Sequence, residues 1–154
     1  MTVKWNSKKV LGKVEEAIAR GLFISAEMVR TRAIESILND PKTGEIYTTL
    51  FFTVGKGEGR IVIPYGTRPA HQASAPGEAP ASDTGTLVNS ITTSIQREQL
   101  TATISVHSIV GKYLEFGTDR MAPRPFMRPA LDQSAKKIKE TIVKEVQAVL
   151  KGAA

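Results

Sequence analysis

A long apolar periodicity near the beginning of the chain constrains the fold more than any other feature. Apolar residues recur every three or four positions from about Ser7 to Leu38, which predicts one amphipathic helix. The stripe consists of Leu11, Val14, Ile18, Leu22, Ala26, Val29, Ala33 and Ile37. Such a helix is roughly 45 Å long, and a chain of 154 residues has too small a core to cover all of it. The sequence therefore indicates a partner for part of this helix, which should end before Pro41.

Two segments after the helix predict a β-hairpin. Glu45–Val54 alternates apolar with polar residues and is rich in β-branched and aromatic side chains. Gly55–Gly59 supplies a turn, and Arg60–Pro64 returns as the second strand. From Tyr65 to Asp83 periodicity is absent and prolines are frequent, so we expect a loop that is flexible over about residues 66–83. Loops of this length are uncommon inside compact domains unless they have a function.

The second half of the chain predicts another hairpin and three further helical segments. Asp83-Thr84-Gly85 can cap a short helical turn. The expected elements after it are strands over Thr92–Arg97 and Thr101–Ser108, a short helix over Val110–Phe116 ending at Gly117, and a closing helix over Met127–Leu150. The closing helix carries the stripe Leu131, Ala135, Ile138, Ile142, Val146 and Val149.

The order of these elements predicts an α+β fold, because runs of strands are bracketed by helices. We expect an antiparallel sheet from two hairpins, packed against the long N-terminal and C-terminal helices, with a long central loop. The length fits a single domain over residues 1–154.

Composition narrows the classes of partner. The net charge is +6, which suits nucleic acid or an acidic protein, but no dense run of like charges exists. We therefore interpret most lysines as solvated helix faces, with nucleic-acid contact as the alternative. The absence of cysteine excludes disulfides and thiolate metal sites. No apolar run approaches the length of a membrane span, so no membrane partner is expected.

A search for catalytic chemistry finds little. Gly55-x-Gly57-x-Gly59 lies between two strands, whereas a phosphate loop leads from a strand into a helix, so we interpret it as a hairpin turn. His71 and His107 have no neighbouring ligands at the spacing that zinc requires. No nucleophile-elbow motif is present. The sequence predicts no catalytic, cofactor or metal site, and a hydrolase that uses either histidine is the weakest alternative.

The segment from Tyr113 to Pro129 concentrates aromatic, methionine and arginine side chains, which are enriched in the cores of protein interfaces. The alternative is that Leu114, Phe116, Phe126 and Met127 seat the last helix on the sheet. With residues from the central loop, the candidate partner-binding set is His71, Gln72, Pro76, Tyr113, Glu115, Phe116, Arg120, Met121, Arg124, Phe126 and Arg128.

Two motifs carry a family resemblance. The segment His71–Ile91 (HQASAPGEAPASDTGTLVNSI) resembles the central signature of the bacteriophage head–tail joining, neck or tail-completion proteins, the "minor tail protein Z" group of long-tailed phages. Tyr113–Thr118 (YLEFGT), with Met121 and Pro123–Leu131 (PRPFMRPAL), is similar to the second signature. The long first and last helices match the layout of that family. The hairpin over Ile46–Pro64 is longer than the family pattern leads us to expect.

The resemblance implies a structural virion protein of a phage or prophage, assembled in the host bacterial cytoplasm, without catalysis or cofactor. It implies a homo-hexameric ring at the head–tail junction that contacts head-completion or connector proteins on one side and tail-tube or tail-terminator proteins on the other. Basic side chains could also touch genome DNA in the lumen without reading its sequence. A tail terminator and a small basic nucleic-acid-binding protein are the alternatives. We further hypothesise that residues 66–83 reach a neighbouring subunit and become ordered only on assembly.

Overall fold

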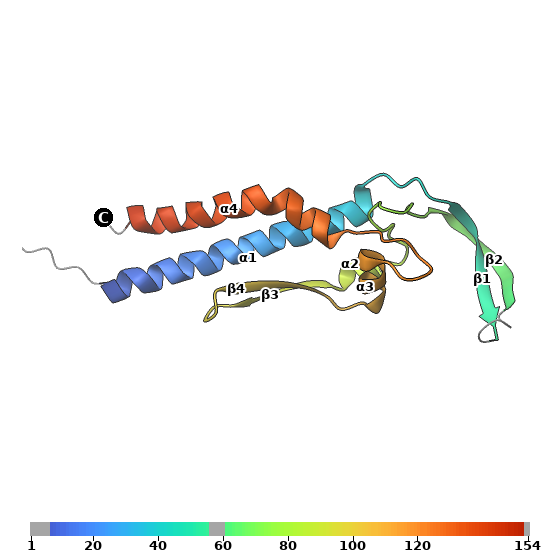
Figure 1. Ribbon diagram of the computed structural model, residues 1–154, viewed down its shortest axis with the longest axis horizontal. Coiled ribbons are helices and arrows are strands. Elements are labelled where there is room, and N and C mark those ends of the chain that lie inside the picture. Colours follow the sequence, from blue (N-terminus) through green and yellow to red (C-terminus); the bar gives the residue numbers. More distant parts are fainter. Residues whose placement is uncertain (1–6, 56–60, 153–154) are drawn as a thin grey trace, which may run out of the picture.

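The computed structural model describes residues 7–55 and 61–152 and confirms the α+β class (Figure 1). The glycine motif over residues 55–59 lies mostly outside these ranges. The elements are α1 (Ser7–Asn39), β1 (Ile46–Val54), β2 (Ile61–Gln72), α2 (Thr86–Asn89), β3 (Ile91–Gln96), β4 (Thr101–Val106), α3 (Ile109–Phe116) and α4 (Met127–Lys151). Helices and the second hairpin therefore begin and end within two residues of their predicted bounds.

The two hairpins form two separate two-stranded antiparallel sheets instead of one. The β3–β4 sheet packs on α1, whereas the β1–β2 hairpin projects from the opposite end of the molecule to the free ends of the helices (Figure 1). The described side chains explain the difference. Ile91 of β3 is completely buried, whereas Ile61, Val62 and Ile63 of β2 alternate between faces and are all exposed. A hairpin that is apolar on both faces has no distinct inner face to turn towards the body.

The loop predicted over residues 66–83 is wrong for residues 66–72, which belong to β2. His71 pairs with Tyr47 and Gln72 with Ile46, and two register shifts accommodate the extra residues of β2. The sequence did not predict this part of the strand because it contains prolines, which have no N–H group to donate to a neighbouring strand. A two-stranded sheet leaves an outer edge on each strand where that donor is not needed, so β2 tolerates them.

The core lies where α1, the beginning of α4 and the β3–β4 sheet meet. Its buried members are Val29, Ala33, Ile37, Ile91, Phe126 and Ala130. Towards the other end, α1 and α4 continue as a helix pair that leaves Leu11 59% exposed. The two helices approach closely, since a β-carbon at position 21 would lie 3.1 Å from the Ile142 Cα.

The predicted stripe of α4 is displaced at its beginning. Ala130 and Ser134 are buried there, whereas Leu131 is 50% exposed and Ala135 is also exposed. Further along, Ile138, Ile142, Val146 and Val149 are partly buried, as expected. The first turns of α4 thus bury the small side chains of Ala130 and Ser134, and Leu131 faces outwards.

Glu115, at the end of α3, caps the N-terminus of α4. Its carboxylate accepts the backbone N–H groups of Phe126 (2.8 Å), Met127 (3.0 Å) and Arg128 (2.9 Å). The first amides of a helix have no partner within the helix, and a negative charge there also offsets the helix dipole. One side chain thus ties α3 to α4 across the arginine-rich link.

We predict opposite effects for two substitutions within α1. Gly21→Leu should lower the free energy of unfolding by about 1–3 kcal/mol, because the side chain cannot enter the contact with α4. Gly12→Leu is the matched control, since a β-carbon there meets nothing within 4 Å, and it should raise stability by about 0.5–1 kcal/mol through helix propensity. Urea denaturation followed by circular dichroism measures both. A gain of stability in both variants would contradict the close packing of the helices.

Removal of the Glu115 cap should be costly. Glu115→Ala leaves three backbone donors without their acceptor, and we expect a loss of about 1–3 kcal/mol in unfolding free energy. Glu98→Ala, in the exposed turn between β3 and β4, should change stability by less than about 0.5 kcal/mol. Equal melting temperatures of the two variants would show that Glu115 does not hold α4.

Candidate interaction surfaces

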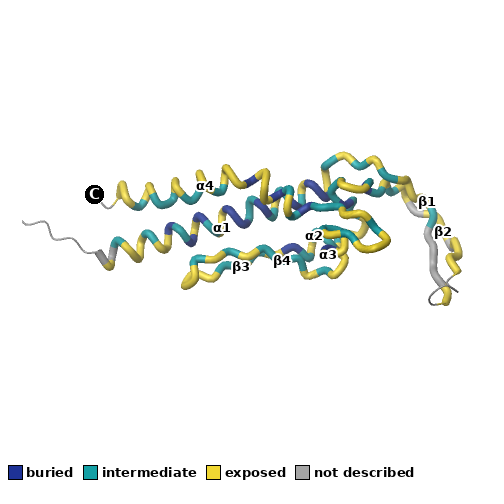
Figure 2. Tube along the Cα trace, viewed as in Figure 1, coloured by how far each residue is buried: buried dark blue, intermediate teal, exposed yellow. Residues whose placement is uncertain are grey.

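The subunit is open for its size. Its accessible surface is 11101 Å², whereas a compact monomer of this mass exposes about 7,600 Å². The largest fully buried side chains are Phe126, Ile37 and Ile91. Figure 2 shows the buried positions mainly along α1 and at the beginning of α4, with exposed residues over the hairpin and the outer side of α4. A small core with so much accessible surface leaves many apolar side chains uncovered within the subunit.

The first surface is the arm, which we define as the β1–β2 hairpin, Ile46–Val54 with Ile61–Gln72. Its described large apolar side chains are exposed: Ile46, Tyr47, Val54, Ile61, Val62 and Ile63, of which Ile46 reaches 63%. Strand β1 contains no charged residue at all. Monomeric proteins usually protect such uncharged edge strands, so the arm has the properties of a strand pair that is covered in an assembly.

The second surface is the outer face of α3, made by Ile109, Tyr113 and Phe116, with Val110 at its margin. The spacing of three and four residues places the first three on one side of the helix, and Phe116 is 75% exposed. The opposite side is turned inwards, where a β-carbon at Gly111 would lie 2.5 Å from Val106 Cγ1. Helix α3 is therefore apolar on both sides: Leu114 packs against the core, whereas Ile109, Tyr113 and Phe116 face solvent, unlike the polar outer face of an ordinary surface helix.

The arginine-rich link divides between structural and exposed residues. Phe126 is 1% exposed and lies in the core, so it seats α4, as the alternative interpretation of this link had it. Glu115 is engaged as the α4 cap. Arg124 donates from Nε to the Ser74 carbonyl (3.0 Å), and its own N–H binds the Leu114 carbonyl (2.6 Å). Met121 is half-buried and pairs with Thr118 in an isolated β-bridge.

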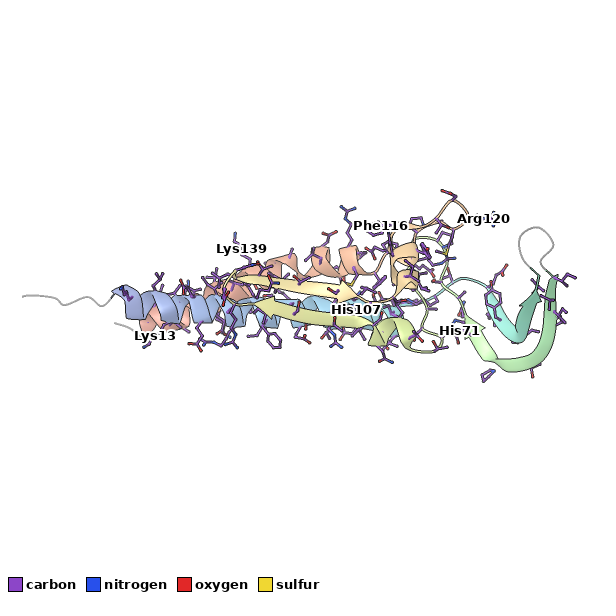
Figure 3. The ribbon with its side chains drawn as sticks, turned by 90° about the horizontal axis from the view of Figure 1, so that it is seen from below. Lys13, His71, His107, Phe116, Arg120 and Lys139 are labelled. Atoms are coloured by element: carbon purple, nitrogen blue, oxygen red, sulfur yellow. The ribbon has the colours of Figure 1, made fainter. Side chains whose placement is uncertain are left out.

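The link residues that remain at the surface lie together with α3. Phe116 and Arg120 project near the same end of the body in Figure 3, and both are exposed, as are Tyr113 and Arg128. Tyr113, Phe116, Arg120 and Arg128 are therefore the members of the predicted set from this link that a partner could reach.

The irregular segment after β2 is held by contacts within the subunit. The Gly44 N–H donates to the Ala73 carbonyl (3.0 Å), and the Ala73 N–H donates to the Glu45 carbonyl (2.9 Å). The Gly77 N–H donates to the Pro123 carbonyl (2.9 Å). The Glu78 carboxylate accepts the hydroxyl and N–H of Thr43 and the N–H of Ala75. These hydrogen bonds, the Thr43 hydroxyl first, hold the pKa of Glu78 below its usual value.

These contacts do not support the hypothesis that residues 66–83 become ordered only on assembly. The supporting residues come from 41–45 and 123–124, which are distant in sequence, so local patterns could not reveal them. Of the predicted contact residues here, Gln72 and Pro76 are exposed and His71 is partly buried in β2. His71 and Gln72 thus lie at the base of the arm, and Pro76 lies in the segment that joins the arm to the body.

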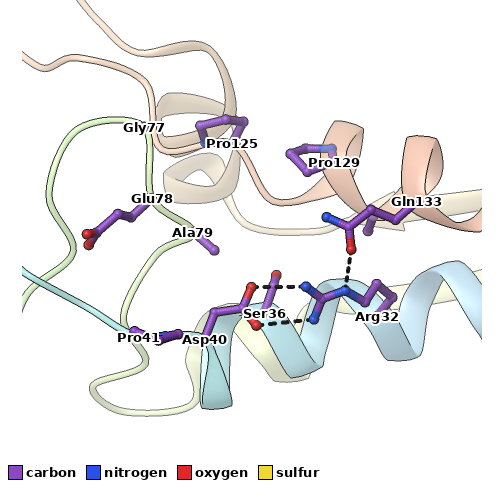
Figure 4. Close-up of a pocket in the computed structure, with 11 residues that line it drawn as sticks. Arg32, Ser36, Asp40, Pro41, Gly77, Glu78, Ala79, Pro125, Pro129 and Gln133 are labelled. Atoms are coloured by element: carbon purple, nitrogen blue, oxygen red, sulfur yellow. Dashed lines mark hydrogen bonds and ion pairs between the residues drawn. The ribbon is translucent and has the colours of Figure 1, made fainter.

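A cleft of about 270 Å³ lies between the end of α1, residues 77–79 and the beginning of α4. Figure 4 shows the Arg32 side chain in this cleft, with its interactions to Asp40 and Gln133 as dashed lines. This side chain binds both carboxylate oxygens of Asp40 (3.2 and 3.1 Å) and the side-chain oxygen of Gln133 (2.6 Å). Arg32 thus links the end of α1 to α4 through Asp40 and Gln133. Because the guanidinium and the carboxylate neutralise each other, the cleft offers little to a charged ligand.

Chemical groups suited to catalysis are dispersed in the described part of the chain. His107 follows β4, where its Nε2 lies 2.9 Å from the Thr92 hydroxyl, and His71 lies in the arm (Figure 3). No group of three His, Asp or Glu side chains within residues 7–55 and 61–152 could hold a metal ion. In the same ranges no helix is long and apolar enough to cross a membrane.

The basic charge lies mainly along the helices. The α4 lysines at positions 136, 137, 139, 144 and 151 are exposed, as is Lys13 of α1; Lys13 and Lys139 are labelled in Figure 3. The ion pairs of the described residues are made by arginines: Arg20 with Glu16 and Glu145, Arg30 with Glu27, and Arg32 with Asp40. The lysines thus form a solvated, spread-out positive surface.

Sequence reasoning missed the apolar residues of the arm and Ile109 as surface residues. The pattern assigned the arm residues to a hairpin in a sheet packed against the long helices, and Ile109 lay between the predicted strand and the predicted short helix. One signal was present: β2 begins Ile61-Val-Ile63, apolar on both faces, although a hairpin with one buried face should alternate.

Comparisons of the chain with protein-family models, with curated proteins and with solved structures find no match.

Proposed function

We propose that this chain is a structural protein of the head–tail junction of a tailed bacteriophage, acting as a tail-completion or neck subunit through protein–protein contacts. The observation that carries the proposal is the open subunit itself: a small core with an uncovered apolar arm and an outward apolar helix. A chain that leaves these surfaces exposed needs partners more than it needs a substrate, and a virion connector is made of such contacts.

The arrangement of the two signature motifs also supports the proposal. His71–Ile91 and Tyr113–Leu131 are separate in sequence, yet they meet through Gly77 and Pro123 (2.9 Å) and through Arg124 and Ser74 (3.0 Å). Together they form the part of the body from which the arm projects. One assembly surface that includes both motifs would account for their contact in the folded chain.

A ring subunit needs two different contact surfaces, because head-to-tail association uses one patch on each side. The arm and the outer face of α3 are two such patches. In the proposed assembly, six copies form the ring, a connector or head-completion protein covers one face, and a tail-tube or tail-terminator protein covers the other. Exposed lysines such as Lys139 could face DNA in the lumen, with affinity that falls as salt increases.

Inactivation of the gene in the phage or prophage that encodes the chain tests this function. We expect lysates that contain DNA-filled heads and separate tails of normal length, visible by electron microscopy, because the joint between them is missing. Supply of the wild-type chain from a plasmid should restore complete virions and plaque formation.

Other outcomes of this experiment identify the alternatives. Tails of uncontrolled length would indicate a tail terminator. Intact, infectious virions would overturn the proposal, and a salt-sensitive DNA complex of the purified monomer would then favour the small basic nucleic-acid-binding protein.

A further inference from the structure

The arm and the outer face of α3 expose apolar side chains that no other part of the subunit covers. A two-stranded hairpin is marginally stable in water, and three strands or packing on a helix are normally required. The nine residues of β1 carry no charge, and the described apolar side chains of β2 are exposed on both faces. An uncharged strand without proline, such as β1, is a site of pairing or aggregation unless another surface covers it.

The arm does not cover the α3 face of its own subunit. Figures 1 and 3 show the arm extending away from the body, clear of α3. The two surfaces therefore face different directions on one chain, and each requires an apolar partner.

We propose that the arm of one subunit packs on the outer face of α3 of a second copy of this chain. The inference rests on the proposed function and specifies the contact that would join neighbours in its ring. It pairs the aromatic rings of Tyr113 and Phe116 with the aliphatic side chains of the arm, a combination that favours packing. Because the two patches differ, the contact is head-to-tail and can continue from copy to copy.

The accessible surface is large enough for a second copy to be the occupant. A stable interface buries about 800 Å² on each partner, and a ring subunit makes two, so about 1,600 Å² is needed per chain. The subunit exposes 11101 Å², which exceeds the value for a compact monomer by about 3,500 Å². An arm-to-arm contact between two copies would cover the hairpins but leave the α3 face exposed.

Cysteine cross-linking tests the contact, since the chain contains no cysteine and gives no background. Val62→Cys and Ile63→Cys place a thiol on either face of the arm, and Phe116→Cys places one on α3. An arm variant mixed with F116C under mild oxidation should form disulfide-linked dimers. The same arm variant mixed with Q147C, an exposed position on α4, should form no disulfide-linked dimer between the two variants. The double variant I63C/F116C should produce a ladder of larger species.

A charge substitution tests the same contact without a cross-linking reaction. Phe116→Glu should raise the dissociation constant for self-association at least tenfold in sedimentation velocity, while the circular dichroism spectrum stays that of the folded chain. Gln147→Glu, which adds the same single negative charge at an exposed position of α4, should leave the constant within twofold of the wild type.

Three results would overturn the inference: dimers that form between arm cysteines instead, failure of arm variants to link to F116C at any protein concentration, or self-association of F116E that equals that of the wild type. The proposed function is tested separately by gene inactivation. Unjoined heads and tails without arm-to-α3 cross-links would leave the junction role in place and remove this contact.

Discussion

The rest of the structure depends on the buried cluster that unites Phe126 with residues of α1 and β3. Phe126 is 1% exposed, and its neighbours in the core are Ile37 of α1 and Ile91 of β3. The same residue begins α4, and its N–H is the first of three that Glu115 binds. Phe126 thus connects the start of α4 to the core through its side chain and to the end of α3 through its N–H. Loss of an aromatic side chain from such a site costs about 3–5 kcal/mol.

A core centred on one end of the helix pair has a consequence for everything distant from it. Burial contributes roughly 25 cal/mol for each Å² of apolar surface, so elements beyond the core gain little within the subunit. The first turns of α1, the arm and the outer face of α3 are in this position, with Leu11, Ile61 and Phe116 among their exposed side chains. The contacts that we propose between copies would supply the missing burial.

Local patterns predicted the helices well and the long-range contacts poorly. A period of 3.6 residues is visible in the sequence, so α1, α3 and α4 were found with nearly correct ends. The extension of β2 through Pro69 was missed, since tolerance of proline depends on which strand edge is free. Among the candidate contact residues, Tyr113 and Phe116 are indeed exposed, but Phe126 and Glu115 serve the subunit itself. Aromatic and charged residues suit either role, and sequence alone does not distinguish them.

The sequence by itself determined the α+β class, the long helices and the two motifs that resemble phage head–tail joining proteins, because each depends on local order of residue types. Tertiary structure alone decided which apolar residues are covered. Gly111 and Phe116 belong to one helix, and the sequence left open whether Phe116 contacts a partner or seats the last helix. In the folded chain Gly111 lies against Val106, whereas Phe116 is exposed to solvent. Burial depends on residues far apart in sequence, so the surfaces available to a partner appear only when the chain is folded.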